Sequence, residues 1–509
     1  MNIPKVLIGW ASCVLVVLAA AGNLLAQTDG ANTSSVTFTT LHSFVGTDGE
    51  SPTGSLVQAT NGDFYGSTSL GTADCTFTGG CGTIFKTTRD GTLSTVYRFC
   101  TQGGSVCSDG NWPWPLTQAT NGDLYGTTQI GGPTANGTAF KLSPSGAYTL
   151  LYSFCTEPDC GDGAIPAPGL LQAANGNLYG TTVAGGAYNF GADGTIFKIT
   201  PSGSLTTIHS FCAQADCADG SEPSGPLVQG PDGNLYGTTQ EGGATCPYSG
   251  GCGTVFRITP DGTLTTIYKF CSQTGCTDGV QPRTGVILAA NGDLYGTTTF
   301  GGDSSSPCIL GGCGTIFKIT PSGTLVTLYT FCKESGCPDG GAPSGLVEAP
   351  SGDLYGTTLA DVGTIFKITP AGTLTTLHTF CAQAGCPDGE FPAGLAQGTD
   401  GKFYGTTLNG GGSANCTGGC GTVFSLSTGE SPFVKTRPLS GVVGEIVGIL
   451  GYGLTGATSV TFNGTPATIL YDAATVVYAK VPTGATTGKV EVVTPKGTLT
   501  SNMAFEVAP

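Results

Sequence analysis

The sequence is poor in charged residues, and positive charge is the scarcest. Lysine and arginine total 18 against 34 aspartates and glutamates, which leaves a formal net charge of -16 over 509 residues. Nucleic acids and anionic membrane surfaces both select for basic patches on the proteins that bind them. We therefore expect no nucleic-acid partner and no binding to an anionic membrane surface.

Helical periodicity is missing as well. No window of the sequence places apolar residues at the spacing that one face of an amphipathic helix requires. Charged residues make up only 10% of the chain, whereas glycine alone contributes 85 residues. This composition is typical of a protein rich in strands and turns, so we predict an all-β fold.

What the chain does contain is one repeated pattern, seen most clearly from residue 285 to residue 339. Four short runs of β-branched and aromatic residues are separated there by turn sequences. Asn291-Gly292 suits a two-residue hairpin because both residues tolerate a positive φ, and Pro321-Ser322-Gly323 makes another link equally tight. Each copy is predicted to be a four-stranded meander with tight turns at one end and long, glycine-rich loops at the other. We call these ends the turn face and the loop face.

A Tyr-Gly pair in the second strand makes the copies easy to count. Seven copies occur, with spacings of 49 to 60 residues, at Tyr65, Tyr125, Tyr179, Tyr236, Tyr295, Tyr355 and Tyr404. Seven four-stranded units indicate a seven-bladed β-propeller, here over residues 36–428. The array begins with TFTTLHSF (37–44), which matches a fourth strand, and ends with GTVFSLS (421–427), which matches a third. The N-terminal strand is therefore predicted to complete the last blade and close the ring, which leaves no free edge.

Two family resemblances follow from these motifs. The unit NGDLYGTT, GG and GTIFKITPSGTLTTLYTF resembles the GloVer tandem repeat, which implies an exported bacterial repeat protein and carries over no catalytic residue. After a linker at 429–432, the cysteine-free residues 432–507 resemble an IPT/TIG domain through Gly451-Tyr452-Gly453, the run 459–464, Val481-Pro482 and Gly488. That resemblance implies a small immunoglobulin-like β-sandwich that adds no chemistry.

The N-terminus has the layout of an export signal. Lys5 precedes an apolar run from Val6 to Ala21, and a small-residue cleavage site ends at Ala26. We assign residues 1–26 to a signal peptide and expect a secreted or cell-surface protein with no membrane span in the mature chain. Retention of the segment as an anchor stays open, because the length of the apolar run is borderline for a span.

Cysteine is the next strong signal, because the 20 cysteines after Cys13 fall into ten close pairs. Six pairs follow the fourth strands: Cys100/Cys107, Cys155/Cys160, Cys212/Cys217, Cys271/Cys276, Cys332/Cys337 and Cys381/Cys386. Four lie between the second and third strands: Cys75/Cys81, Cys246/Cys252, Cys308/Cys313 and Cys416/Cys420. In an exported chain these predict ten local disulfides on the loop face. A set of zinc sites is the weaker interpretation of these cysteines. Zinc needs four converging ligands, whereas each cysteine pair stands alone in its own loop.

A residue present in every copy serves the blade, so a functional site must break the repeat. His42, His209 and His378 occupy fourth-strand positions that other copies fill with tyrosine, which argues against a general base. An aspartate precedes glycine at the entrance of every blade: Asp48, Asp109, Asp162, Asp219, Asp278, Asp339 and Asp388. Turn formation explains all seven, although calcium binding in these loops stays open.

Four residues break the repeat in a way that suggests a site. Trp112 and Trp114 are the only tryptophans after the signal segment, and Arg283 and Glu348 differ from their equivalents in the other copies. Exposed tryptophans can bind sugar rings, while tryptophans between prolines can equally fill a gap between blades. We name these four residues as the candidate ligand-binding residues. No paired carboxylates, Ser/His/Asp set or phosphate loop can be assembled, so no catalytic residue, metal site or cofactor is predicted.

The function we predict is non-catalytic. The chain would act as a binding or envelope structural protein through its disulfide-linked loop face, as a monomer, with a glycan or a surface protein as partner. The alternative is an extracellular carbohydrate-active enzyme, a polysaccharide hydrolase or lyase, with acidic residues on the loop face. Converging carboxylates near the axis of the ring would favour the enzyme. The turn face is expected to be inert.

Overall fold

The computed structural model describes residues 36–71, 81–101, 107–187, 193–243, 246, 250–302 and 312–508. The predicted signal segment 1–26 lies outside the described residues, as do Cys75 and Cys308. All described residues belong to one compact unit, Ser35–Pro509. Within these ranges, no helix is long and apolar enough to cross a membrane.

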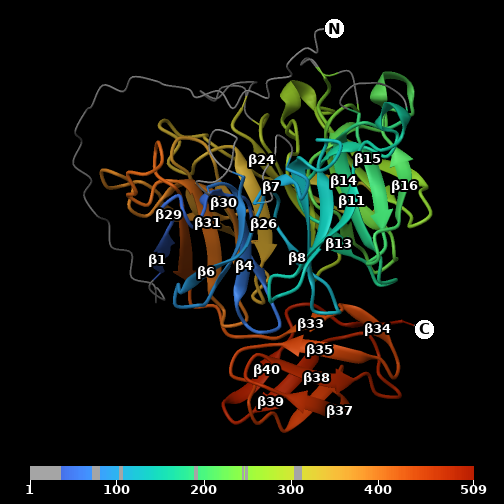
Figure 1. Cartoon of the computed structure of the whole chain (residues 1–509), viewed down its shortest axis with the longest axis vertical. Coiled ribbons are helices and arrows are strands. Elements are labelled where there is room, and N and C mark those ends of the chain that lie inside the picture. Colours follow the sequence, from blue (N-terminus) through green and yellow to red (C-terminus); the bar gives the residue numbers. More distant parts are fainter. Residues whose placement is uncertain are drawn as a thin grey trace. The chain divides into compact units, whose positions relative to one another are not determined.

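Seven antiparallel sheets form the seven blades of a propeller, and their strands follow one another along the chain (Figure 1). The first strands are β2 (Glu50–Pro52) with β3 (Val57–Gln58), β7 (Asn111–Pro113) with β8 (Thr117–Gln118), β12 (Ala164–Pro166) with β13 (Leu171–Gln172), β17 (Ser221–Pro223) with β18 (Val228–Gln229), β22 (Ile287–Leu288), β26 (Pro343–Glu348) and β30 (Glu390–Gln397). The second strands are β4 (Phe64–Leu70), β9 (Leu124–Ile130), β14 (Leu178–Ala184), β19 (Leu235–Glu241), β23 (Leu294–Thr298), β27 (Leu354–Thr358) and β31 (Phe403–Asn409).

The outer half of each blade is equally regular. The third strands are β5 (Thr83–Thr87), β10 (Thr138–Leu142), β15 (Thr195–Ile199), β20 (Thr254–Ile258), β24 (Thr315–Ile319), β28 (Thr364–Ile368) and β32 (Thr422–Ser427). The fourth strands are β6 (Leu93–Arg98), β11 (Tyr148–Ser153), β16 (Leu205–Ser210), β21 (Leu264–Lys269), β25 (Leu325–Thr330), β29 (Leu374–Thr379) and β1 (Thr37–Ser43). Within the described ranges, three short 3-10 helices lie in cysteine loops: η1 (Pro158–Cys160), η2 (Ala215–Cys217) and η3 (Thr274–Cys276).

The ring closes as the sequence predicts. β1 pairs antiparallel with β32, from Thr37 opposite Ser427 to Ser43 opposite Thr422, and so becomes the fourth strand of the last blade. Figure 1 shows β1, in blue, beside the orange strands of that blade. β2 of the first blade also contacts β31 of the last. The N-terminal segment therefore removes the edge that β32 would otherwise expose.

Phenylalanine joins each blade to the next. A buried phenylalanine after each fourth strand meets the third-strand phenylalanine of the following blade edge-on, with ring centroids 5.0–5.5 Å apart. The glycine of each Tyr-Gly pair makes room for that third-strand ring, since an added Cβ would lie 2.4–2.7 Å from it. The seven pairs are Phe44–Phe85, Phe99–Phe140, Phe154–Phe197, Phe211–Phe256, Phe270–Phe317, Phe331–Phe366 and Phe380–Phe424.

Residues 435–508 form a separate all-β element. One curled sheet has the strand order β33 (Lys435–Arg437), β35 (Ile446–Leu450), β38 (Val476–Lys480), β37 (Thr465–Asp472), β36 (Ser459–Phe462), β39 (Val490–Thr494) and β40 (Gly497–Thr500). A parallel pair, β34 (Ser440–Val442) and β41 (Glu506–Ala508), accompanies it. The sheet curls around its own apolar core, which includes Val447, Phe462 and Phe505. It is a single curled sheet rather than two clearly separate layers.

The turn face carries contacts with the C-terminal sheet. The Arg437 guanidinium donates hydrogen bonds to the carbonyls of Gln58, at 2.8 Å, and Gln118, at 3.1 Å, which end the first strands of two blades. The Lys435 ammonium donates to the carbonyl of Gln397 in a third blade. The C-terminal sheet is therefore bound to the turn ends of three blades within the same compact unit.

Candidate functional site

At or just before the loop end of each first strand, a proline follows a residue in left-handed conformation. These seven residues have φ between 51° and 57°, a region that non-glycine residues rarely adopt. They are Ser51, Trp112, Ile165, Glu222, Gln281, Ala342 and Phe391. All lie at the loop end of the first strands. First strands of adjacent blades contact one another, as β18, β22, β26 and β30 do in succession, so the loop ends surround the axis of the ring.

Contacts between blades hold this unusual backbone in place. In six of the seven blades the left-handed residue donates its backbone N–H to a carbonyl of the preceding blade, as Glu222 does to Asp193 at 3.1 Å and Ser51 does to Cys420 at 3.1 Å. The proline that follows packs on a glycine of that blade, where a Cβ would lie 2.3–2.7 Å from the proline ring. Trp112 instead donates to the side chain of its neighbour Asn111 at 2.7 Å. The backbone is thus fixed while the side chains are free to differ.

The side chains on either side of this proline do differ from blade to blade. The residues before and after it are Ser51 and Thr53, Trp112 and Trp114, Ile165 and Ala167, Glu222 and Ser224, Gln281 and Arg283, Ala342 and Ser344, and Phe391 and Ala393. Three predicted site residues belong to this set, because Trp114 and Arg283 occupy the same position in different blades and Trp112 precedes Pro113. The structure therefore brings Trp112, Trp114 and Arg283 to the same end of the ring.

The two tryptophans have different surroundings. Trp112 is 38% exposed, the same fraction as Leu150 of the ring. Trp114 is half-buried, and its indole N–H donates to the carbonyl of Pro166 in the next blade at 2.9 Å. Trp114 thus makes a contact between two blades, whereas Trp112 is the more exposed of the two tryptophans.

Glu348 lies apart from the other three predicted residues. It ends β26 at the turn face, where its carboxylate accepts the backbone N–H of Ala290 in the preceding blade at 2.8 Å. The equivalent glutamines Gln118, Gln172, Gln229 and Gln58 accept the same bond from their preceding blades at 2.8–3.0 Å. Burial raises the pKa of Glu348 above its usual value. Glu348 therefore makes the blade-to-blade contact that glutamine makes elsewhere.

Sequence reasoning missed Glu222 on the loop face, which lies near two further carboxylates, Asp193 and Glu241. Glu222 on β17 follows Ser221, whose backbone pairs with Glu241 at the end of β19, and the N–H of Glu222 bonds to Asp193 in the blade before. Burial, with repulsion from Glu241, raises the pKa of Glu222 to about 7 despite the nearby Arg283. A sequence signal did exist, since Asp193 stands where four other copies have cysteine before Gly-Thr.

Each Asp-Gly aspartate is bound by the fourth strand that precedes it in the ring. The fourth-strand tyrosine donates its hydroxyl to the carboxylate in four blades, and histidine Nε2 lies against it in the other three, all at 2.8–3.2 Å. Backbone N–H groups of the cysteine loop also donate to it, as Cys100 does to Asp109 at 3.0 Å. This contact explains why tyrosine and histidine interchange at this position. The oxygens that calcium would need are thus engaged by chain donors.

The predicted cysteine pairs form disulfides wherever both members are described. These are Cys100–Cys107, Cys155–Cys160, Cys212–Cys217, Cys246–Cys252, Cys271–Cys276, Cys332–Cys337, Cys381–Cys386 and Cys416–Cys420. Cys81 and Cys313 are also disulfide-bonded. So many disulfides suit an extracellular protein.

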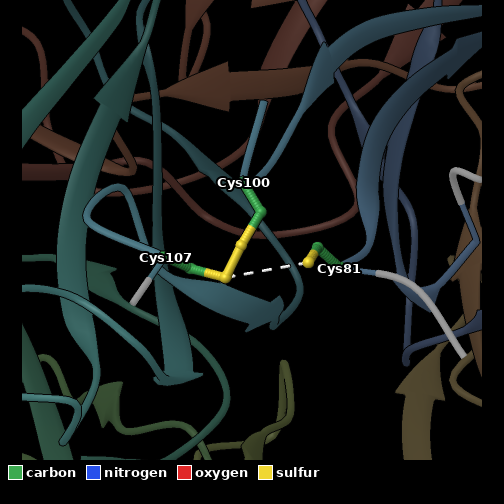
Figure 2. Close-up of side chains that lie close together, drawn as sticks. All are labelled: Cys81, Cys100 and Cys107. Carbon is green, nitrogen blue, oxygen red and sulfur yellow. Dashed lines mark hydrogen bonds between the residues drawn. A yellow bond between two sulfur atoms is a disulfide. The ribbon is translucent and has the colours of Figure 1, made fainter. Parts of the chain in front are cut away.

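One premise about the cysteines was wrong, because the pairs do not all stand alone. Cys81 Sγ lies 3.7 Å from Cys107 Sγ, beside the Cys100–Cys107 disulfide (Figure 2). Sulfur atoms also gather around Cys252 and around Cys313. Among the described residues, a cysteine before the third strand thus lies against the cysteine loop after the fourth strand in three blades.

Comparison with known proteins gives one family and a set of distant folds. A model described as the Gloeobacter/Verrucomicrobia repeat matches residues 30–192, 156–337 and 306–446. No curated protein matches the chain in sequence.

Three solved structures resemble it at low identity. A copper-bound fungal alcohol oxidase of the AA5 family is 12% identical, with 93% of this chain and 99% of that chain covered and a TM-score of 0.49. A putative gluconolactonase is 16% identical, with 63% and 90% covered and a TM-score of 0.36. The PQQ-bound aldose sugar dehydrogenase of Streptomyces coelicolor is 18% identical, with 62% and 93% covered and a TM-score of 0.38. Likenesses this distant assign no activity.

Proposed function

This chain belongs to the Gloeobacter/Verrucomicrobia repeat family, and from that premise we propose that it is a secreted or cell-surface binding protein that contacts its ligand with the loop face of the propeller. The ring is the scaffold, and the side chains flanking the seven first-strand prolines are the recognition surface. Residues 1–26 serve as the export signal. The ligand is a glycan or a surface protein.

The observation that carries this proposal is where the repeat varies. The blade framework recurs from copy to copy, whereas the residues beside the prolines range from alanine to tryptophan and from glutamate to arginine. A rigid scaffold with variable side chains at one end is a common design for recognition surfaces. Exposed Trp112 is the best anchor, because tryptophan and arginine dominate interface hot spots. The indole face also suits the apolar face of a sugar ring.

The C-terminal residues 432–507 complete this proposal as an IPT/TIG-like module that acts as a spacer. Its contacts with Gln58 and Gln118 are at the turn ends of the blades. A spacer held there leaves the loop face free for a ligand.

The test is an array of glycans and bacterial surface proteins probed with the mature secreted chain. Trp112→Ala should abolish retention on the ligand so identified without lowering the melting temperature, because the side chain is exposed. Tyr471→Ala is the matched control, since it removes another aromatic side chain, 55% exposed, from the C-terminal sheet. Retention unchanged in Trp112→Ala and Arg283→Ala alike would refute the proposed surface.

A second candidate, a carbohydrate-active enzyme, is favoured by the carboxylates of Asp193, Glu222 and Glu241. Incubation of the protein with polysaccharides should then release new reducing ends, or unsaturated products in the case of a lyase. Glu222→Gln would abolish that release, because a carboxyl group with a raised pKa suits a general acid. Glycan binding without release of any product would contradict the enzyme candidate and support the binding function.

A further inference from the structure

We propose that the C-terminal sheet, residues 435–508, is a latch that holds the ring shut at the joint between β32 and β1. The two ends of the repeat array meet at this joint. A short loop connects β1 to the first blade, whereas the C-terminal sheet follows β32 on the other side of the joint. Opening of the joint would therefore pull this sheet away from the first blade. The role goes beyond that of a spacer and does not depend on any ligand.

One strand of the sheet binds both sides of the joint. Lys435 on β33 donates to the carbonyl of Gln397 in the last blade, on its own side of the joint. Arg437, on the same strand, donates to the carbonyls of Gln58 in the first blade, at 2.8 Å, and Gln118 in the second, at 3.1 Å. It also donates to the side-chain oxygen of Gln118 at 3.2 Å. β33 thus connects the two blades at the joint and the blade that follows them.

The three carbonyls are equivalent, because Gln397, Gln58 and Gln118 each end the first strand of their blade. First strands lie at the edges of their sheets, and an edge strand leaves backbone groups unpaired. All seven blades carry this carbonyl. In the described part of the chain, however, the side chains of β33 bind it in the two blades at the joint and in the next one. The repeat itself does not dictate that choice.

The turns after the first strands make a second set of bonds across the joint. The backbone N–H of Phe433 donates to the carbonyl of Thr399 in the last blade at 3.1 Å. The hydroxyl of Thr475 donates to the carbonyl of Thr60 in the first blade at 2.9 Å. Thr399 and Thr60 occupy the same position of the repeat. The C-terminal residues therefore bind equivalent turns on the two sides of the joint.

Arg89 connects the joint to the C-terminal sheet at a third point. It lies in the turn between β5 and β6 of the first blade, and its Nε is 3.7 Å from Asp400 Oδ2 in the last blade. The same guanidinium lies over the ring of Tyr452 in the C-terminal residues, 4.8 Å from its centroid. Such a cation is attracted by the face of the aromatic ring. A spacer would need only the covalent link at 429–432, whereas these contacts gather at the joint.

The experiment is hydrogen exchange of the full secreted chain, read by mass spectrometry in peptides from β1 and β16. Opening of the joint exposes the amides of β1 while the middle of the array stays folded. Arg437→Met should speed exchange in β1 about ten-fold or more, because a hydrogen bond from a charged donor contributes about that factor, and should leave β16 unchanged. Thr475→Val removes one neutral donor and should speed exchange in β1 about five-fold. Lys480→Met is the matched control: it removes an exposed cation of β38 and should change neither peptide.

Other results would overturn the proposal. Exchange in β1 that is the same in Arg437→Met, Thr475→Val and the wild type would show that the C-terminal sheet does not hold the joint. Equal acceleration of β1 and β16 would show that the sheet stabilises the whole ring rather than its joint. If Arg437→Met fails to fold, Thr475→Val decides the question, because it loses a single hydroxyl and keeps the shape of the side chain.

Discussion

Phe44 offers a direct test of ring closure, because the repeat supplies a matched residue in the other blades. Its side chain is fully buried and meets the ring of Phe85 in the first blade at 5.2 Å. Phe211 is equally buried and meets Phe256 at 5.3 Å. The difference is that Phe44 belongs to the N-terminal segment, which joins its blade only through the pairing of β1 with β32. If that pairing closes the ring, the two phenylalanines are equivalent.

The expected cost follows from burial. Replacing a buried phenylalanine by alanine costs about 3–5 kcal/mol of unfolding free energy through lost apolar contact and the remaining cavity. The edge-to-face pair accounts for about 0.5–1.5 kcal/mol beyond the buried area. We therefore expect Phe44→Ala and Phe211→Ala to lower the free energy of unfolding by similar amounts, within about 1 kcal/mol of each other given such cavity costs.

The assay is urea unfolding without reductant, followed by tryptophan fluorescence, with limited proteolysis of the same samples. Both variants should show lower midpoints than the wild type, and Phe44→Ala should also be cleaved faster within residues 36–45. A wild-type midpoint for Phe44→Ala, together with a lowered one for Phe211→Ala, would refute the closed ring. It would mean that β1 contributes nothing to the last blade.

Three further predictions concern His378, the disulfide Cys100–Cys107 and Lys435. Burial lowers the pKa of His378, so as pH falls its imidazole is protonated in the unfolded chain before it is protonated in the folded chain. The melting temperature should therefore drop between about pH 7 and about pH 5. The drop should be smaller in His378→Tyr. Equal drops in both proteins would contradict this. Non-reducing peptide mapping should find Cys100 joined to Cys107 even though Cys81 Sγ lies 3.7 Å away; a peptide linking Cys81 to Cys107 would show another pairing. Burial lowers the pKa of Lys435 from 10.5 to about 8, so the wild type should gain stability as pH rises between these values. Lys435→Met should lack that gain, and a parallel gain in the variant would exclude Lys435 as its source.

Much of the fold could be predicted from the sequence, because the seven copies of the repeat can be compared with one another. Seven copies of one unit give the strand order, and the tight Asn-Gly and Pro-Ser-Gly links give the turn face. An array that begins with a fourth strand and ends with a third can close only by joining its ends. Disulfides between cysteines four to seven residues apart are equally local, and the eight that are described pair as expected.

Contacts between blades could not be predicted in this way, because the sequence of one repeat unit does not show which residues of the neighbouring blade it packs against. Gln118 could be recognised as a recurring residue, yet its bond to Thr60 of the preceding blade exists only in the assembled ring. Glu348 stood out in the sequence as a departure from glutamine, and only the structure shows it accepting the same kind of bond. The immunoglobulin-like prediction for residues 432–507 likewise rested on motifs, while the curvature of that sheet comes from packing around its core.

The sequence by itself thus determined the number of blades, their strand order, the closure of the ring and the local cysteine pairs, since each depends on residues close in the chain or on the two ends of the array. Only the tertiary structure decided that Trp112, Trp114 and Arg283 share one end of the first strands and that Glu222 lies near Asp193 of the preceding blade. Trp114 and Arg283 come from different blades, as do Asp193 and Glu222. The place of each first strand depends on the packing of its proline against the preceding blade, which no single copy of the repeat encodes.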